Sequence, residues 1–90
     1  MKRYNYCTIC YMGEDIEVTH TPWDGEKTVV YFEQNDKVAG LKELTCTIPG
    51  YKLGEGDKFT SEEVSQLLLF AKCSAATLIN NSKSGGVNNA

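Results

Sequence analysis

Cysteines are the residues of this chain best suited to chemistry, because a thiolate can bind a metal ion or act as a nucleophile. Cys7 and Cys10 have the CxxC spacing that supplies half of a tetrahedral zinc or iron site. A complete site needs a second such pair, whereas Cys46 and Cys73 each stand alone. Residues three apart on a regular strand also point to opposite faces of the sheet. We therefore expect free thiols, no metal site and no cofactor.

His20 offers the cysteines one other chemical use, as the base of a thiol-imidazole pair. If Gly13-Glu14 forms a two-residue turn, Cys7 lies opposite His20 in the resulting hairpin. A nucleophilic cysteine also needs a group that orients its base and a site that stabilises an oxyanion, and the sequence indicates neither. We expect His20 to be structural and the chain not to be an enzyme. The alternative is a Cys/His-dependent enzyme or redox protein that uses Cys7 and His20.

The elements that position these residues begin with four strands. Runs rich in β-branched and aromatic residues, bounded by Gly and Pro turn signals, predict strands at 3–12, from the turn at 13–14 to His20, at 28–34 and at 41–48. The first hairpin would then pair Ile9 with Val18 and Tyr11 with Ile16 on the core-facing side. In the fourth strand, the side chains predicted to point inward are Leu44, Cys46 and Ile48.

A long helix follows the strands. Thr60 and Glu63 form a capping box, and Phe59 can pack against Val64 across the helix start. An apolar stripe at helical spacing faces the core and comprises Val64, Leu67, Leu68, Ala71, Ala75, Leu78 and Ile79. Three further residues widen this face beyond what one sheet must cover and are candidates for another contact: Leu69, Phe70 and Cys73.

Together these elements predict an α+β fold with the order ββββα. Four strands form an antiparallel meander, and the one long C-terminal helix packs on one face of it. Ninety residues allow one hydrophobic core, so we expect a single domain at 1–80 and a flexible C-terminal tail at 81–90.

Charge and hydropathy exclude several classes of function. The nine basic residues are scattered and twelve acidic residues outnumber them, giving a net charge of -3, which argues against a nucleic-acid partner. No segment approaches the roughly 20 apolar residues that cross a bilayer, and no apolar run follows Lys2-Arg3 as in a signal peptide. We expect an acidic cytoplasmic protein without a membrane partner.

Two short segments resemble parts of known families. The run at 6–11 (YCTICY) resembles the first cysteine knuckle of a rubredoxin, and the chain has no second knuckle. The stretches 48–51 (IPGY), 56–57 (GD) and 62–64 (EEV) are similar to the strand, Pro-Gly turn and acidic helix start of HicB-type antitoxins. This second likeness covers less than a fifth of the chain, and the loop is longer than that family's.

Elimination favours a small non-enzymatic protein-interaction domain, such as an inhibitor, an antitoxin-like protein or an adaptor. It would bind another protein, or a second copy of itself, through an exposed sheet face or edge. Aromatic residues and Met are enriched in interface cores, so the candidate contact residues are Tyr4, Tyr6, Met12, Trp23 and Phe32. A small-ligand-binding homodimer is a further alternative.

Overall fold

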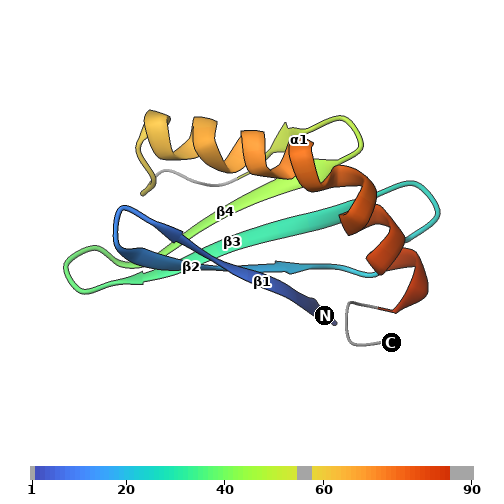
Figure 1. Cartoon of the computed structure of the whole chain (residues 1–90), viewed down its shortest axis with the longest axis horizontal. Coiled ribbons are helices and arrows are strands. Elements are labelled where there is room, and N and C mark those ends of the chain that lie inside the picture. Colours follow the sequence, from blue (N-terminus) through green and yellow to red (C-terminus); the bar gives the residue numbers. More distant parts are fainter. Residues whose placement is uncertain (1, 55–57, 86–90) are drawn as a thin grey trace.

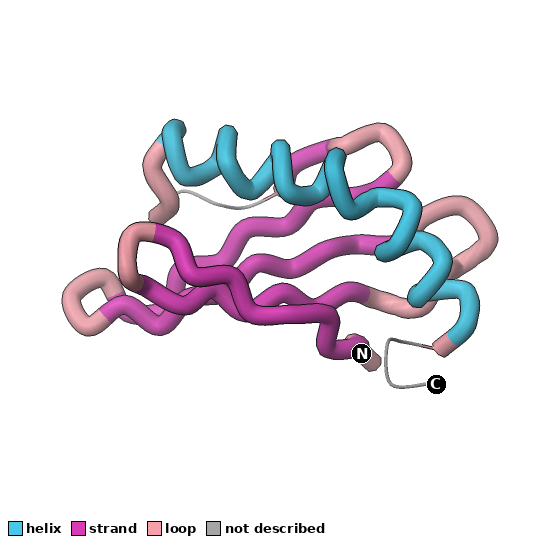
Figure 2. Tube along the Cα trace, in the orientation of Figure 1, coloured by secondary structure: helices cyan, strands magenta, loops and turns pink. Residues whose placement is uncertain are grey.

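The protein is an antiparallel sheet with one helix lying across one of its faces (Figures 1 and 2). The structure, a computed structural model, describes residues 2–54 and 58–85. The elements in chain order are β1 (Tyr4–Tyr11), β2 (Glu14–His20), β3 (Thr28–Asp36), β4 (Gly40–Ile48), β5 (Lys52–Leu53) and α1 (Ser61–Ser84). The sheet order is β1-β2-β3-β4-β5. The predicted α+β meander with a C-terminal helix is confirmed, and the short β5 is an addition to it.

The core lies between α1 and the central strands. Alternate residues of β2, β3 and β4 point toward the helix, and α1 packs against β3 and β4. The inward orientation predicted for β4 is confirmed. The buried apolar side chains are Ile16, Val18, Val30, Phe32, Leu44, Cys46, Ile48, Phe59, Leu67, Ala71 and Leu78.

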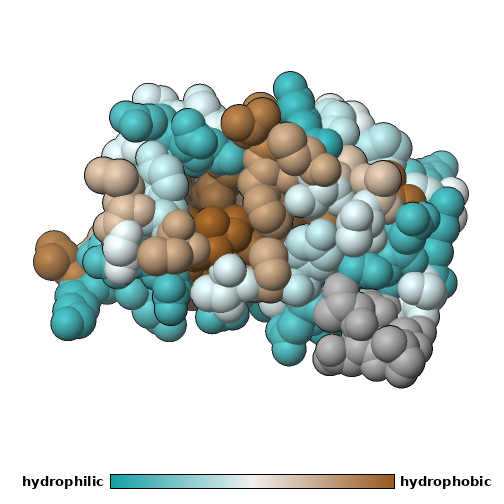
Figure 3. Space-filling model, viewed as in Figure 1, coloured by the Kyte–Doolittle hydropathy of each residue, from teal (hydrophilic) through white to brown (hydrophobic). Residues whose placement is uncertain are grey.

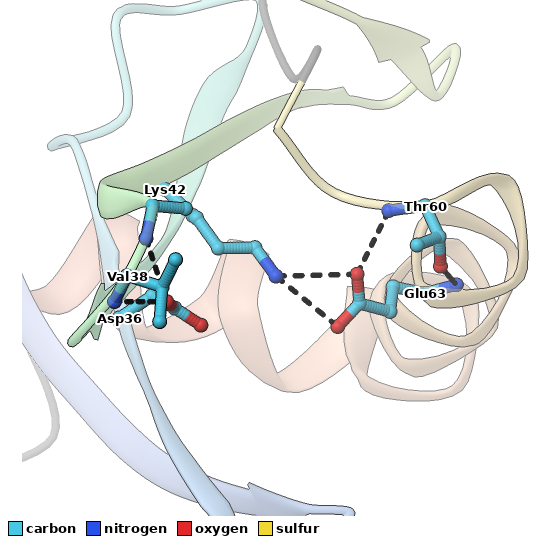
Figure 4. Close-up of polar contacts among 6 residues, drawn as sticks. Asp36, Val38, Lys42, Thr60 and Glu63 are labelled. Carbon is cyan, nitrogen blue, oxygen red and sulfur yellow. Dashed lines mark hydrogen bonds and ion pairs between the residues drawn. The ribbon is translucent and has the colours of Figure 1, made fainter.

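The start of α1 is fixed by the predicted capping box and by one ion pair (Figure 4). Thr60 Oγ1 accepts a hydrogen bond from the Glu63 N–H at 3.1 Å, and the Glu63 carboxylate accepts one from the Thr60 N–H at 2.8 Å. The Lys42 ammonium of β4 lies 3.3 Å from the same carboxylate and 4.8 Å from the centre of the Phe59 ring. The cap therefore anchors the helix to the sheet as well as starting it.

The helix ends later than its apolar stripe predicts. It runs to Ser84 and stops at Gly85, whose φ of 94° is the left-handed conformation that favours glycine. Ser82 is buried; its hydroxyl donates to the Ile79 carbonyl at 2.8 Å and its own carbonyl accepts from the Trp23 N–H at 3.0 Å. This contact with the β2–β3 loop holds the last turn in the fold. Residues 86–90 of the predicted tail lie outside the described residues.

The register of the first hairpin differs from the predicted one by two residues. Its turn is Met12-Gly13, with φ values of 55° and 81°, so both central residues are left-handed. As a result Ile9 pairs with Ile16 and Tyr11 with Glu14. The predicted turn at Gly13-Glu14 is wrong because Met12 adopts a conformation that non-glycine residues rarely take.

Among the described residues, no helix is long and apolar enough to cross a membrane.

Candidate protein-binding edge and groove

β1 forms a free edge of the sheet. Among the described residues it pairs with β2 on one side only, and its eight residues, YNYCTICY, include no charge. The opposite edge, β5, is only two residues long and one of them is Lys52. Charges and short lengths are the usual means of preventing pairing between sheet edges. The protein therefore protects its β5 edge and leaves β1 open to a further strand.

A β-bulge in β1 sets which side chains face the helix. Asn5 pairs with Thr19 and Cys7 with Val18, so Tyr6 is an extra residue in β1. The insertion reverses the alternation of side chains along the strand. It allows Tyr4, the inserted Tyr6 and, after the bulge, Ile9 and Tyr11 to be half-buried on the helix side.

An apolar groove runs between β1 and α1. Its volume is about 320 Å³, and the residues that line it are Ile9, Tyr11, Gln66, Leu67, Leu69, Phe70 and Cys73. Figure 3 shows the corresponding apolar area in the middle of this face of the molecule. The groove lies beside β1 because α1 packs mainly over β3 and β4. Leu69 is 54% exposed in it.

The predicted extra contact of Leu69, Phe70 and Cys73 has a structural counterpart in this groove. These three residues line its helix side. Their signal in the sequence was an apolar helix face wider than one sheet requires. Ile9 and Tyr11, which line the strand side, were missed as site residues because the sequence pattern assigned them to the core.

The structure does not bring the five predicted contact residues together. Phe32 is 0% exposed in the core, and Tyr4 and Tyr6 pack edge-to-face on His20 at 5.6 and 6.2 Å between ring centroids. Met12 is 85% exposed in the β1–β2 turn, while Trp23 lies under the Lys83 ammonium near the other end of α1. The bulge turned Tyr4 and Tyr6 toward the helix, and β3 points Phe32 inward.

Cys7 and His20 do not form the predicted pair. The Cα partner of Cys7 is Val18, and that of His20 is Tyr4, because the turn and the bulge both change the register. Although Cys7 is exposed, partial burial of its thiol and the neighbouring Glu17 carboxylate raise the pKa of that thiol, which disfavours the nucleophilic thiolate. The thiol-imidazole geometry that the enzymatic alternative requires is therefore absent.

His20 is instead a buried side chain with one satisfied nitrogen. It is 0% exposed, and its Nδ1 lies 3.1 Å from the Thr21 carbonyl, so Nδ1 carries the proton and donates it. Its Nε2 is buried and has no hydrogen-bond partner within the part of the chain that the structure describes. Burial lowers the pKa of His20, and the Thr21 hydrogen bond opposes this only in part.

The outer face of the sheet carries a row of acidic residues. Glu17, Glu33 and Glu43 are directly opposite one another on β2, β3 and β4. Glu17 and Glu33 border an open hollow of about 660 Å³, whose other lining residues are Gly13, Glu14, Asp15, Asn35 and Leu41. Within the described parts of the chain, no group of three or more His, Cys, Asp or Glu residues is arranged to hold a metal ion.

The β1 edge and the apolar groove beside it are therefore the strongest candidate site. Comparison of the chain with protein-family models, with curated proteins and with solved structures finds no match.

Proposed function

We propose that this chain is a small protein-binding domain that takes up an extended segment of a polypeptide along β1. The single observation that carries the proposal is an uncharged eight-residue free edge that runs beside an apolar groove. An added strand gains main-chain hydrogen bonds from such an edge, and pockets for its alternate side chains give specificity. The edge and the groove supply these two parts.

The groove side of the site suits a partner with apolar side chains. A strand paired with β1 presents every second side chain to the helix side of the sheet. There it meets Leu69, Phe70 and Cys73 on α1. Burial of apolar area stabilises such a contact by roughly 25 cal/mol per Å². The partner segment should therefore alternate apolar and polar residues, with the apolar ones turned toward α1.

The cytoplasm is the compartment that we propose for this function. The described cysteines Cys7, Cys10, Cys46 and Cys73 are all free thiols. Exposed thiols such as those of Cys7 and Cys10 persist in a reducing environment.

Binding of selected peptides tests the proposal. Peptides are selected from a random display library against the immobilised chain. The selected sequences should favour an extended conformation and alternate apolar with polar residues. Their affinities are measured at low micromolar protein concentration. Leu69→Gln should weaken binding about tenfold, equivalent to about 1.4 kcal/mol. Leu41→Gln is the matched control, since Leu41 is 50% exposed on the opposite face. Equal effects of the two substitutions would contradict the proposal.

A further inference from the structure

Opposite charges flank the two ends of β1. Lys2 and Arg3 directly precede the uncharged strand, and Glu14 and Asp15 follow its turn. Within the described residues, Lys2, Glu14 and Asp15 form no ion pair, and the Lys2 ammonium only lies over the Tyr4 ring at 5.2 Å. A strand that is basic at one end and acidic at the other is complementary to an antiparallel copy of itself.

The bulge makes the side chains of β1 self-complementary as well. Antiparallel pairing about a twofold axis perpendicular to the sheet keeps the helix sides of both copies on the same side. On a regular strand, Tyr4 and Tyr11 would face opposite sides, but the extra residue at Tyr6 places both toward the helix. An alignment that sets Tyr4 opposite the partner's Tyr11 also sets Tyr6 opposite the partner's Ile9. All four are half-buried apolar or aromatic residues.

The charges fit the same alignment. Beyond the pairing of Tyr4 with the partner's Tyr11, the partner chain enters its Met12-Gly13 turn. The alignment therefore brings Lys2, two residues before Tyr4, beside that turn and near the partner's Glu14, and the twofold axis repeats this contact once more. Opposite charges across an interface fix its register and exclude other alignments. A single register therefore matches both the side-chain faces and the charges.

From these observations we propose that a second copy of this chain is a binding partner of the β1 site. This inference rests on the proposed function and names its partner. The two β1 strands pair antiparallel and join both sheets into one, and the exposed flank of α1 at Leu69 borders the junction on the helix side. The dimer is isologous, so each surface contributes the same residues.

Sedimentation equilibrium in reducing buffer, from low micromolar to submillimolar concentration, tests the inference. The mass should rise reversibly from the 10.0 kDa of one chain to twice that value. Cys10→Lys places a charge on the edge and should weaken association about tenfold. The fold should tolerate this lysine because Cys10 is exposed and its Cα partner is Asp15. Far-ultraviolet circular dichroism and thermal melting check that the variant is folded, and Leu41→Gln should remain dimeric.

A charge exchange tests the alignment itself. Lys2→Glu and Glu14→Lys should each weaken self-association, because each variant sets like charges together twice. An equimolar mixture of the two variants should restore the dimer, because both contacts in the mixed pair then join opposite charges. A mixture that stays at monomer mass would overturn the alignment and with it the inference.

The outcome of this test is separable from that of the proposed function. If the wild-type chain stays at monomer mass, the inference that a second copy is the partner is overturned. The selected peptides then decide the proposed function by themselves, since their binding to a monomer does not depend on self-association. A dimer that is insensitive to Cys10→Lys and to both charge reversals also overturns the inference, because it must use another surface.

Discussion

The ring of Tyr6 on β1 lies edge-to-face with the ring of Phe70 on α1, with 6.2 Å between their centroids. Phe70 makes a similar contact with Phe32 of the core at 6.1 Å. Three aromatic rings thus connect the edge strand to the helix and the helix to the centre of the sheet. Such pairs contribute about 0.5–1.5 kcal/mol beyond the area that they bury. They hold the bulged strand against α1, and Phe70 also lines the groove.

Stability should fall in acid because of His20. Burial lowers its pKa in the folded state, so below the ordinary value of about 6.5 the unfolded chain takes up a proton that the folded chain does not. The contribution is fully present above pH 6.5 and declines below it, by at most about 1.4 kcal/mol per pH unit. His20→Phe should flatten this dependence. Loss of the imidazole does not leave the Thr21 carbonyl unsatisfied, because that carbonyl also accepts a hydrogen bond from the Thr28 hydroxyl at 2.6 Å. Thermal melts of both proteins between pH 5 and 7.5 measure the effect, and parallel curves would contradict it.

Removing one carboxylate from the outer face should stabilise the protein at neutral pH. A hydrogen bond with the Glu33 side chain raises the pKa of Glu43, with smaller effects from burial and from the Glu33 charge. The folded state therefore favours protonated Glu43, and this contribution is lost as pH rises through its folded pKa. Glu43→Gln keeps a donor toward Glu33 and should add about 0.2–1 kcal/mol at pH 7. A melting temperature of Glu43→Gln below that of the wild type at pH 7, or a gain in stability at pH 4 as large as that at pH 7, would contradict this prediction.

The cap of α1 should depend on Glu63 more than on Thr60. Thr60→Ala removes one acceptor and should cost about 1 kcal/mol. Glu63→Gln leaves the nearly buried Lys42 ammonium without its counter-ion and should cost about 1.5–3 kcal/mol. The double variant Lys42→Met/Glu63→Gln should recover part of that loss, because the uncompensated charge is gone. Urea unfolding of the wild type, these three variants and the single variant Lys42→Met gives the free energies. If the losses of Lys42→Met and Glu63→Gln simply add in the double variant, the coupling is excluded.

Thiol labelling should show no activated cysteine. Burial raises the pKa of Cys46 and, together with the Glu17 charge, that of Cys7. Since only the thiolate reacts, Cys7 should react more slowly at pH 7 than an unperturbed exposed thiol. Cys46, in the core, should react only after unfolding. Mass spectrometry of peptides labelled over time assigns each rate. One cysteine that reacts faster than a free thiol would revive the enzymatic alternative that uses Cys7 and His20.

The helix and the core strands could be predicted from the sequence because their signals are local. The Thr60–Glu63 box fixes where α1 begins, and alternate apolar residues identify the inner face of β4. The last turn of α1 could not be predicted, because Ser82 is held by a contact with Trp23, far away in the sequence. No residue type in the sequence predicts such a long-range contact.

The candidate site depended on features that the sequence does not signal. Met12 takes a left-handed conformation without being glycine, and Tyr6 is inserted without any Gly or Pro to mark a bulge. These two features decide which residues of β1 face α1. The groove further depends on α1 lying mainly over β3 and β4, which is a property of tertiary packing. The helix side of the site, at Leu69, Phe70 and Cys73, was the part that an unusually wide apolar face could indicate.

Amide hydrogen exchange with and without a selected peptide, at low micromolar concentration, tests the binding edge most directly. A strand added to β1 gives hydrogen-bond partners to amides that otherwise face solvent. Exchange should therefore slow along Tyr4–Tyr11, with a smaller effect at 69–73 on α1, and should stay unchanged on the outer face around Glu33 and Leu41. Slowing on the outer face with unchanged exchange in β1 would contradict the β1 edge as the binding site.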